Sequence, residues 1–279
     1  MDALTISLML IAALLHSSWH ALVKASNNGI TVLAGMNLVS AGAALFVVPF
    51  VAFPAVEIWP ILALSALLQS TYKVSLSYAY RYGDLSQSYP AVRGLTPVFA
   101  TLIAFMALGE RPPFLQLIGT LLLTLGILMF VAEKRDQGFG LRTLAFVAIA
   151  ALMVAGYSVS NGFGARTNRD WLSYTVWLLL LDGGAFVAAV SATHGRLFWT
   201  TIAARWQFTC LSGLLGLISF SVFLWALSRS SIGGVVALRE TSVLFAYLIG
   251  IVFLKERWSL LRFVGCLLVT LGVATIAAH

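Results

Sequence analysis

One stretch occurs twice in this chain, and it decides the fold. Residues 91–130 read AVRGLTPVFATLIAFMALGERPPFLQLIGTLLLTLGILMF, and residues 237–276 read ALRETSVLFAYLIGIVFLKERWSLLRFVGCLLVTLGVATI. A shift of 146 residues aligns the two without a gap, with 16 identities in 40 positions. Leucine-rich runs match by chance, but matched arginines, glutamates and glycines indicate an internal repeat. The matched positions include Arg93 with Arg239, Glu110-Arg111 with Glu256-Arg257, Gly119 with Gly265, and Thr124 and Gly126 with Thr270 and Gly272.

The composition is typical of a membrane protein. Of the 279 residues, 60% are hydrophobic and 10% are charged, against about 25% charged residues in a typical soluble domain. The mean hydropathy of +0.96 excludes a soluble enzyme and a disordered chain. The net charge of +7 is scattered, with no basic cluster larger than Lys134-Arg135, which argues against nucleic-acid binding. Cys210 and Cys266 lie inside apolar runs and indicate neither a disulfide framework nor a zinc site.

Ten segments of the chain are long enough to cross a bilayer, which requires about 20 apolar residues. The breaks between them hold the turn-forming and charged residues. We therefore predict an all-α membrane protein with ten transmembrane helices. The predicted helices are 4–23, 31–53, 59–80, 87–108, 113–132, 143–163, 172–193, 206–228, 233–254 and 259–277.

Each copy of the repeat contains five of these helices. Because five is odd, the second copy enters the membrane from the opposite side, which makes an inverted-topology repeat. We predict the first repeat at 1–132, a short linker loop at 133–142 and the second repeat at 143–279. Repeats of this kind place a substrate site near the middle of the membrane, between the two halves, and use their symmetry for alternating access.

Two turns and one helix give the sequence a family resemblance. GER at 109–111 and KER at 255–257 each precede a glycine-rich helix, and the first helix contains HSSWHALVK at 16–24. On these motifs the whole chain resembles the drug/metabolite transporter superfamily, in its ten-helix EamA-type branch. The resemblance implies a multi-pass cell-membrane protein that moves a small metabolite without ATP, through a cavity between two five-helix bundles. Small multidrug members of the superfamily depend on a first-helix glutamate that this chain lacks, which argues against cation–proton exchange.

The repeat-related Arg93 and Arg239 are the first candidates for substrate binding, because charges inside a membrane are costly. A guanidinium group binds carboxylate or phosphate through two parallel hydrogen bonds. By resemblance, phosphate-exchanging relatives use basic residues on these same two helices. We expect the two arginines to bind the anionic group of the substrate together; the alternative is that they reach for lipid headgroups. Glu240 either pairs with Arg93 across the interface or binds an ammonium group of the substrate.

A polar stripe on the third helix is the next candidate. Ser65, Gln69, Tyr72, Lys73 and Tyr80 fall on one face at 100° per residue. We expect this face to line a water-accessible cavity and Gln69, Tyr72 and Lys73 to contact substrate. The alternative is a polar seam buried between helices.

His16, Trp19 and His20 share a face of the first helix. Histidine titrates near neutral pH, so the two histidines are candidates for proton coupling, with hydrogen-bonded packing as the alternative. Trp19 and Tyr157, at the corresponding place in the second repeat, are candidates for substrate contact. With no Cys, Asp or Glu nearby on that helix, we expect no metal site.

Asp182 lies near the middle of the seventh helix, where it is protonated, hydrogen-bonded or paired with a base, and it is a further candidate for proton coupling. The paired glycines of the fifth and tenth helices are seven residues apart and share a face. We expect them to pack those two helices together or to form a homodimer contact. These glycines are Gly119, Gly126, Gly265 and Gly272.

These features favour a secondary transporter of a small anionic or zwitterionic metabolite, such as an amino acid, an organic acid, or a phosphorylated or phosphonate compound. The runner-up is an exporter of amphiphilic or cationic compounds, and the sign of the charge in the cavity separates the two. We find no catalytic motif and no nucleotide-binding loop, so we predict neither an enzyme nor a cofactor. The expected partners are the substrate and the lipid bilayer.

The loop charges suggest an orientation. Ten Lys and Arg residues follow the odd-numbered helices, and four follow the even-numbered ones or their turns: Arg111, Arg166, Arg169 and Arg229. The positive-inside rule places the richer side in the cytoplasm and both termini outside. The family resemblance suggests the reverse.

Overall fold

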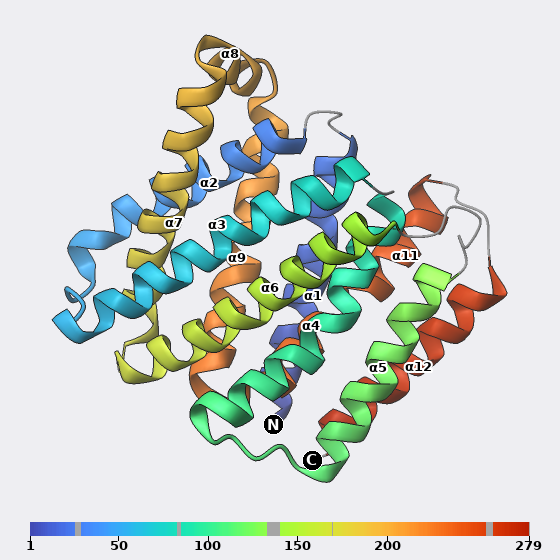
Figure 1. Cartoon of the computed structure of the whole chain (residues 1–279). Helices are drawn as coiled ribbons and strands as arrows, with labels where there is room; N and C mark the ends of the chain where they lie inside the picture. The colour runs from blue at the N-terminus through green and yellow to red at the C-terminus, as the bar shows by residue number, and fades with distance from the viewer. Residues whose placement is uncertain (26–28, 83–84, 133–139, 169, 255–258, 279) are drawn as a thin grey trace.

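The computed structural model describes residues 1–25, 29–82, 85–132, 140–168, 170–254 and 259–278. Over these ranges the chain forms helices and no strand (Figure 1). Two 3₁₀ turns, η1 (Val48–Phe50) and η2 (Val56–Ile58), join the second and third helices. The α-helices are α1 (Ala3–Ala25), α2 (Gly29–Val47), α3 (Trp59–Tyr82), α4 (Leu85–Leu108), α5 (Phe114–Ala132), α6 (Leu141–Thr167), α7 (Trp171–His194), α8 (Arg196–Ala204), α9 (Trp206–Arg229), α10 (Ile232–Arg239), α11 (Ser242–Leu254) and α12 (Leu260–Ala277).

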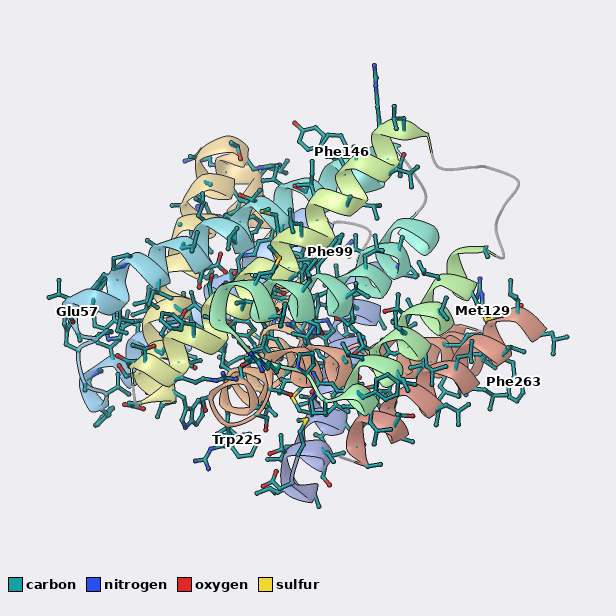
Figure 2. All side chains as sticks on the ribbon, turned by 60° about the horizontal axis from the view of Figure 1, so that its bottom comes forward. Glu57, Phe99, Met129, Phe146, Trp225 and Phe263 are labelled. Carbon is teal, nitrogen blue, oxygen red and sulfur yellow. The ribbon has the colours of Figure 1, made fainter. Side chains whose placement is uncertain are left out.

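The helices have the length and the surface of membrane spans. Within the described ranges, 8 helical stretches are long and apolar enough to cross a bilayer, and Phe114–Met129 of α5 is a shorter apolar helix. The third helix, α3, has 24 residues but carries the polar stripe. Large apolar side chains project from the bundle, such as Phe46 and Phe263, the second of which is labelled at the edge of Figure 2. The all-α membrane fold is confirmed, and the count of ten spans stays a prediction.

Two of the predicted segments differ from the structure. The ninth, 233–254, is not one continuous helix, because it breaks between α10 and α11 at Glu240-Thr241. Around the break the amides of Thr241, Val243 and Leu244 bond to the carbonyl three residues earlier, so the helix tightens and changes course. The second, 31–53, ends as an α-helix at Val47. The break after the seventh helix holds the short helix α8.

Helix packing follows the inverted repeat. The contact of α3 with α6 has its counterpart in the contact of α9 with α1, because each pair joins the third helix of one repeat to the first helix of the other. Three further pairs join equivalent helices of the two repeats: α4 with α10, α2 with α7, and α5 with α12. Figure 1 shows α5 and α12 side by side. A pseudo-two-fold axis in the membrane plane relates the two halves.

The pairing of α5 with α12 depends on glycine. A Cβ atom on Gly119 would lie 2.6 Å from the carbonyl oxygen of Gly272, and one on Gly126 would lie 2.6 Å from that of Gly265. The two contacts exchange under the 146-residue shift, so the helices run antiparallel and cross at the axis. The predicted packing role of these glycines between the fifth and tenth helices is confirmed, since any side chain would force the backbones apart.

Candidate functional site

Five of the predicted site residues gather where the two repeats meet. His16 comes from α1, Arg93 from α4, Tyr157 from α6, and Arg239 and Glu240 from the end of α10. Arg93, Arg239 and Glu240 expose 2%, 7% and 0% of their surface. The alternative interpretation, in which the arginines reach lipid headgroups, is therefore not met, since both guanidinium groups are enclosed by protein.

Arg93 and Glu240 form an ion pair across the repeat interface. The Nη1 atom of Arg93 donates to Oε1 of Glu240 at 3.1 Å. This is one of the two roles expected for Glu240. Its other carboxylate oxygen, Oε2, is buried and accepts no hydrogen bond from the part of the chain that the structure describes.

Arg239 has a different environment from its repeat counterpart. Its guanidinium carbon lies 4.2 Å from the ring centre of Phe223, and its Nη1 donates a long hydrogen bond of 3.4 Å to the hydroxyl of Tyr157. Its Nε atom is buried without a hydrogen-bond acceptor, and no carboxylate of the described residues forms an ion pair with it. Of the two repeat-related arginines, Arg93 is therefore neutralised by a carboxylate, whereas Arg239 contacts the ring of Phe223 and the hydroxyl of Tyr157.

The backbone ladder is interrupted beside both arginines. Pro97 has no amide hydrogen, so the carbonyl of Arg93, four residues earlier in α4, loses its helical donor. In the second repeat the interruption is the break between α10 and α11, where the hydroxyl of Thr241 donates to the carbonyl of Leu238 at 2.7 Å. Interrupted helices at such depth supply polar backbone groups to a site in many transporters.

The site holds more hydrogen-bond donors than acceptors. The Nε1 of Trp19 faces Nδ1 of His16 at 3.2 Å, and Nη2 of Arg93 lies 2.5 Å from Nε2 of the same ring. His20 reaches that Nε2 as well, at 3.2 Å, and stacks on Trp19. A neutral imidazole accepts at one nitrogen only, and indole and guanidinium only donate. The two contacts of His16 therefore cannot both be hydrogen bonds, and the cluster is short of an acceptor.

A second polar cluster lies where α2, α3 and α7 meet. Lys73 donates to Oδ2 of Asp182 at 2.8 Å and to Oδ1 of Asn37 at 3.1 Å, and its ammonium lies 4.4 Å from the ring centre of Phe186. Ser70 donates to the other carboxylate oxygen of Asp182 at 3.4 Å. Asp182 is thus paired with a base, one of the states expected for it, and Lys73 is matched by a carboxylate.

The stripe on α3 is divided between partners. The hydroxyls of Ser65 and Tyr174 lie 3.1 Å apart, and Tyr174 also donates to Asn161. The ring of Tyr72 lies 6.1 Å from that of Tyr157 and so joins the arginine cluster. Gln69 is buried, with its Nε2 unsatisfied by the described residues. The side chain of Tyr80 lies outside the described part of the structure.

Two polar residues of the second cluster, Ser70 and Asp182, have apolar residues at the corresponding positions of the other repeat. The 146-residue shift maps Ser70 to Gly216 and Asp182 to Met36. These two positions also meet, since a Cβ atom on Gly216 would lie 3.0 Å from the methyl carbon of Met36. At these equivalent places one interface therefore carries a charged pair, and the other carries no charge.

A third set of contacts ties the α4–α5 turn to the start of α10. Glu110 accepts from Nη1 of Arg166 at 2.6 Å and from the amide of Ile232 at 3.0 Å. Arg166 also donates to the carbonyls of Leu227 and Ser230. Gly109 starts the turn with a φ of 68°, a conformation that favours glycine. The sequence indicated the turn but not these cross-repeat bonds; the matching Glu256-Arg257 lies outside the described residues.

Comparison with known proteins agrees with this architecture. The model of the EamA-like transporter family matches residues 3–132 and 141–278. The chain belongs to the EamA-like transporter family. A solved structure titled "Crystal structure of protein" is similar to this EamA-like transporter with a TM-score of 0.77, at 17% identity over 99% of this chain and 96% of that one. At that identity the likeness shows the fold alone. A search of curated protein sequences finds no match.

The resemblance inferred from the sequence motifs is thereby confirmed, as is a multi-pass membrane location. Family membership makes the chain a membrane transporter. Among the described residues, no group of three or more His, Cys, Asp or Glu side chains is placed to hold a metal ion.

Proposed function

We propose that this EamA-like transporter is a secondary carrier of a small anionic or zwitterionic metabolite, which binds at Arg239 between the two repeats. The observation that carries the proposal is the buried guanidinium of Arg239, whose Nε has no acceptor within the described structure. A buried charge without a partner is costly, so a bound carboxylate or phosphate would remove a penalty as well as add hydrogen bonds.

The neighbouring carboxylate extends the argument to zwitterions. Oε2 of Glu240 is buried and lacks a donor, one residue from the Nε of Arg239 that lacks an acceptor. A molecule carrying both a carboxylate or phosphonate and an ammonium group would satisfy both atoms. In this scheme Arg93 neutralises the first oxygen of Glu240, and Arg239 is the anchor for the anion. This refines the expectation that Arg93 and Arg239 bind the anion together.

The donor excess around His16 supports the same substrate class. An anionic oxygen that accepted from Arg93 or Trp19 would let His16 keep a single donor. Histidine-mediated proton coupling, with His16 and His20, remains part of the proposal, because both rings lie within this network. Asp182 is the less favoured residue for proton coupling, because its carboxylate is already paired with the ammonium group of Lys73.

One feature favours the runner-up, an exporter of amphiphilic or cationic compounds. Aromatic rings surround the arginine cluster: Trp19 stacks on His20 at 3.6 Å between ring centres, Tyr72 meets Tyr157, and Phe223 lies over Arg239. Such rings bind flat apolar molecules and cations. Against it, Arg239 would repel a cation, and no carboxylate of the described cluster is free of an arginine.

The test is binding and flux with purified protein. We would measure thermal stabilisation by L-serine, succinate, 2-aminoethylphosphonate and ethidium, then follow uptake of any stabilising compound into liposomes. An anion or zwitterion is expected to bind, and Arg239→Gln to weaken its affinity about ten- to a hundredfold, the equivalent of one charge-assisted hydrogen bond. Arg142→Gln, at an exposed helix start, is the matched control. Stabilisation by ethidium alone, or an unchanged affinity in Arg239→Gln, would contradict the proposal.

A further inference from the structure

A cavity separate from the buried arginine cluster lies at the end of the bundle that holds the α4–α5 turn. Its volume is about 310 Å³, and its walls come from the ends of α4, α6 and α9 and the starts of α5 and α10. It therefore touches both repeats. Trp225, labelled in Figure 2, lies on α9 one turn before the arginine that lines this cavity.

The cavity gathers positive charge. Arg111, Arg166 and Arg229 line it, together with one acid, Glu110. These are three of the four basic residues on the side of the membrane that the loop count finds poor in positive charge. Because this side of the membrane has few basic residues, the presence of three of them in one cavity is not explained by the overall charge of the loops.

The one acid does not neutralise the remaining arginines. Both carboxylate oxygens of Glu110 are occupied, one by Arg166 and the other by the amide of Ile232. Arg229 lies over the ring of Trp225 at 5.2 Å, and neither it nor Arg111 forms an ion pair with any residue that the structure describes. Two guanidinium groups thus face the cavity without a counter-ion.

Neutral donors converge on the same place. Thr101 lines the cavity and exposes only 9% of its surface, and its Oγ1 has no hydrogen-bond partner among the described residues. This hydroxyl lies against the first turn of α10, since a Cβ atom on Gly233 would be 2.5 Å from it. The Ser231 side chain, at the N-cap of α10, donates to Gln116 instead of capping the helix. The amides of Gly233 and Gly234 are therefore left to an outside acceptor.

We propose that this cavity is a binding site for a phosphate-like anion, with Arg111 and Arg229 as its cations and Thr101 and the first turn of α10 as its neutral donors. Free guanidinium groups, a buried unsatisfied hydroxyl and a helix N-terminus are the combination that binds phosphate oxygens. The phosphate belongs either to a soluble anion or to the headgroup of an anionic lipid, since the cavity lies at the bundle end. Bound there, the anion bridges the α4–α5 turn and the end of α9, which belong to different repeats.

The experiment uses the full-length protein purified in a neutral detergent, with inorganic phosphate as the first probe. Thermal stability is titrated with phosphate against chloride at matched ionic strength. The second arm uses nanodiscs of phosphatidylcholine with phosphatidylglycerol, from which co-purified lipid is quantified. The test variant is Arg111→Gln/Arg229→Gln, two exposed positions, and Thr101→Val removes one donor without changing the charge. Arg142→Gln is the control, and Arg239→Gln reports separately on anion binding at the central arginine.

Saturable stabilisation by phosphate, weakened tenfold or more in the double variant, would establish a soluble-anion site. Enrichment of phosphatidylglycerol in the wild type, lost in the double variant, would establish a headgroup site. Either result supports the proposal when Arg142→Gln behaves as the wild type does. The proposal is overturned if the double variant changes neither readout, or if Arg239→Gln alone abolishes both, because the anion would then bind at the central arginine. Failure here leaves the function proposed for Arg239 untouched.

Discussion

Asn37 and Gly183 occupy equivalent positions of the two repeats, and they touch. A Cβ atom on Gly183 would lie 3.1 Å from the carbonyl oxygen of Asn37 and 3.2 Å from Cβ of Ala41. The 146-residue shift turns 37 into 183, so this contact is its own counterpart and lies on the pseudo-two-fold axis. The polar cluster of Lys73 and Asp182 lies beside that axis, because Asn37 is itself a member of the cluster and Asp182 precedes Gly183 in α7.

This contact predicts a contrast between two adjacent glycines. We expect Gly183→Val to destabilise the protein by about 1–3 kcal/mol, the usual cost of overpacking, because α2 and α7 would have to separate. Gly184→Val adds the same side chain where nothing lies within 4 Å and is the matched control. Thermal unfolding of the two variants in detergent makes the comparison. Equal stabilities would show that the two helices do not approach closely at the axis.

The ion pair of Lys73 and Asp182 predicts strong coupling. Removing one partner of a largely buried pair leaves the other charge uncompensated, at a cost of about 3–5 kcal/mol. We expect Lys73→Met and Asp182→Asn each to lower stability markedly, and the double variant to lose much less than their sum. A double-mutant cycle on thermal stability measures the coupling. Additive losses would mean that the two side chains are not paired in the membrane.

The arrangement of two arginines and one glutamate predicts an order of severity. Glu240→Gln breaks the ion pair of Arg93 and leaves two buried arginines with no carboxylate nearby, whereas Arg93→Gln leaves the carboxylate of Glu240 one residue from Arg239. We therefore expect Glu240→Gln to be the more destabilising change and to be partly rescued by any anion that binds the site. Melting temperatures of the two variants, with and without the substrate found in the flux screen, test this. If Arg93→Gln were the more destabilising change, the carboxylate of Glu240 would interact with Arg93 and not with Arg239.

The bonds of Glu110 predict a local role in stability. Glu110→Ala removes an acceptor from the first amide of α10, worth about 1 kcal/mol for a helix cap, and a partly exposed ion pair worth up to about 1 kcal/mol more. We expect a measurable loss in thermal stability. Glu57, an exposed residue of η2 at the edge of Figure 2, gives the control Glu57→Ala. Indistinguishable variants would show that the cross-repeat bonds of Glu110 contribute nothing.

The loop charges predict the orientation. Counting Lys and Arg places both termini outside the cytoplasm, on the same side as the arginine-lined cavity. We expect a C-terminal alkaline phosphatase fusion to be active. A C-terminal fusion to a fluorescent protein that folds only in the cytoplasm should not fluoresce. The opposite pair of results would favour the orientation suggested by the family resemblance.

Much of this architecture could be predicted because it rests on properties that the sequence displays directly. Helix length, apolar composition and the repeat of Arg93 with Arg239 are one-dimensional signals, and so is the glycine spacing that packs α5 against α12. The pairing of Arg93 with Glu240 was one of two alternatives that the repeat left open. Both lie on equivalent helices, and the α4–α10 contact brought them together.

The remaining features depend on contacts that no local pattern encodes. The α10–α11 break at Glu240-Thr241 has no Pro or Gly, so the apolar run reads as one helix. Arg166 meets Glu110 across 56 residues and Lys73 meets Asp182 across 109, and nothing in the spacing of either pair specifies the partner. The difference between Arg93 and Arg239 arises from one extra carboxylate, at a position where the first repeat has Gly94.

The unequal interfaces on the two sides of the axis have a kinetic consequence. Opening the α3–α7 interface hydrates Ser70, Lys73 and Asp182, whereas opening the α2–α9 interface exposes Met36 and Gly216. The two empty states of the proposed carrier therefore differ in free energy, and one of them predominates at rest. When no gradient of a coupled ion is present, such a carrier obeys the substrate gradient alone, so the ratio of maximal rate to half-saturation constant must be equal in both directions. The half-saturation constants themselves need not be, and the same substrate would saturate one face of the membrane at a lower concentration than the other.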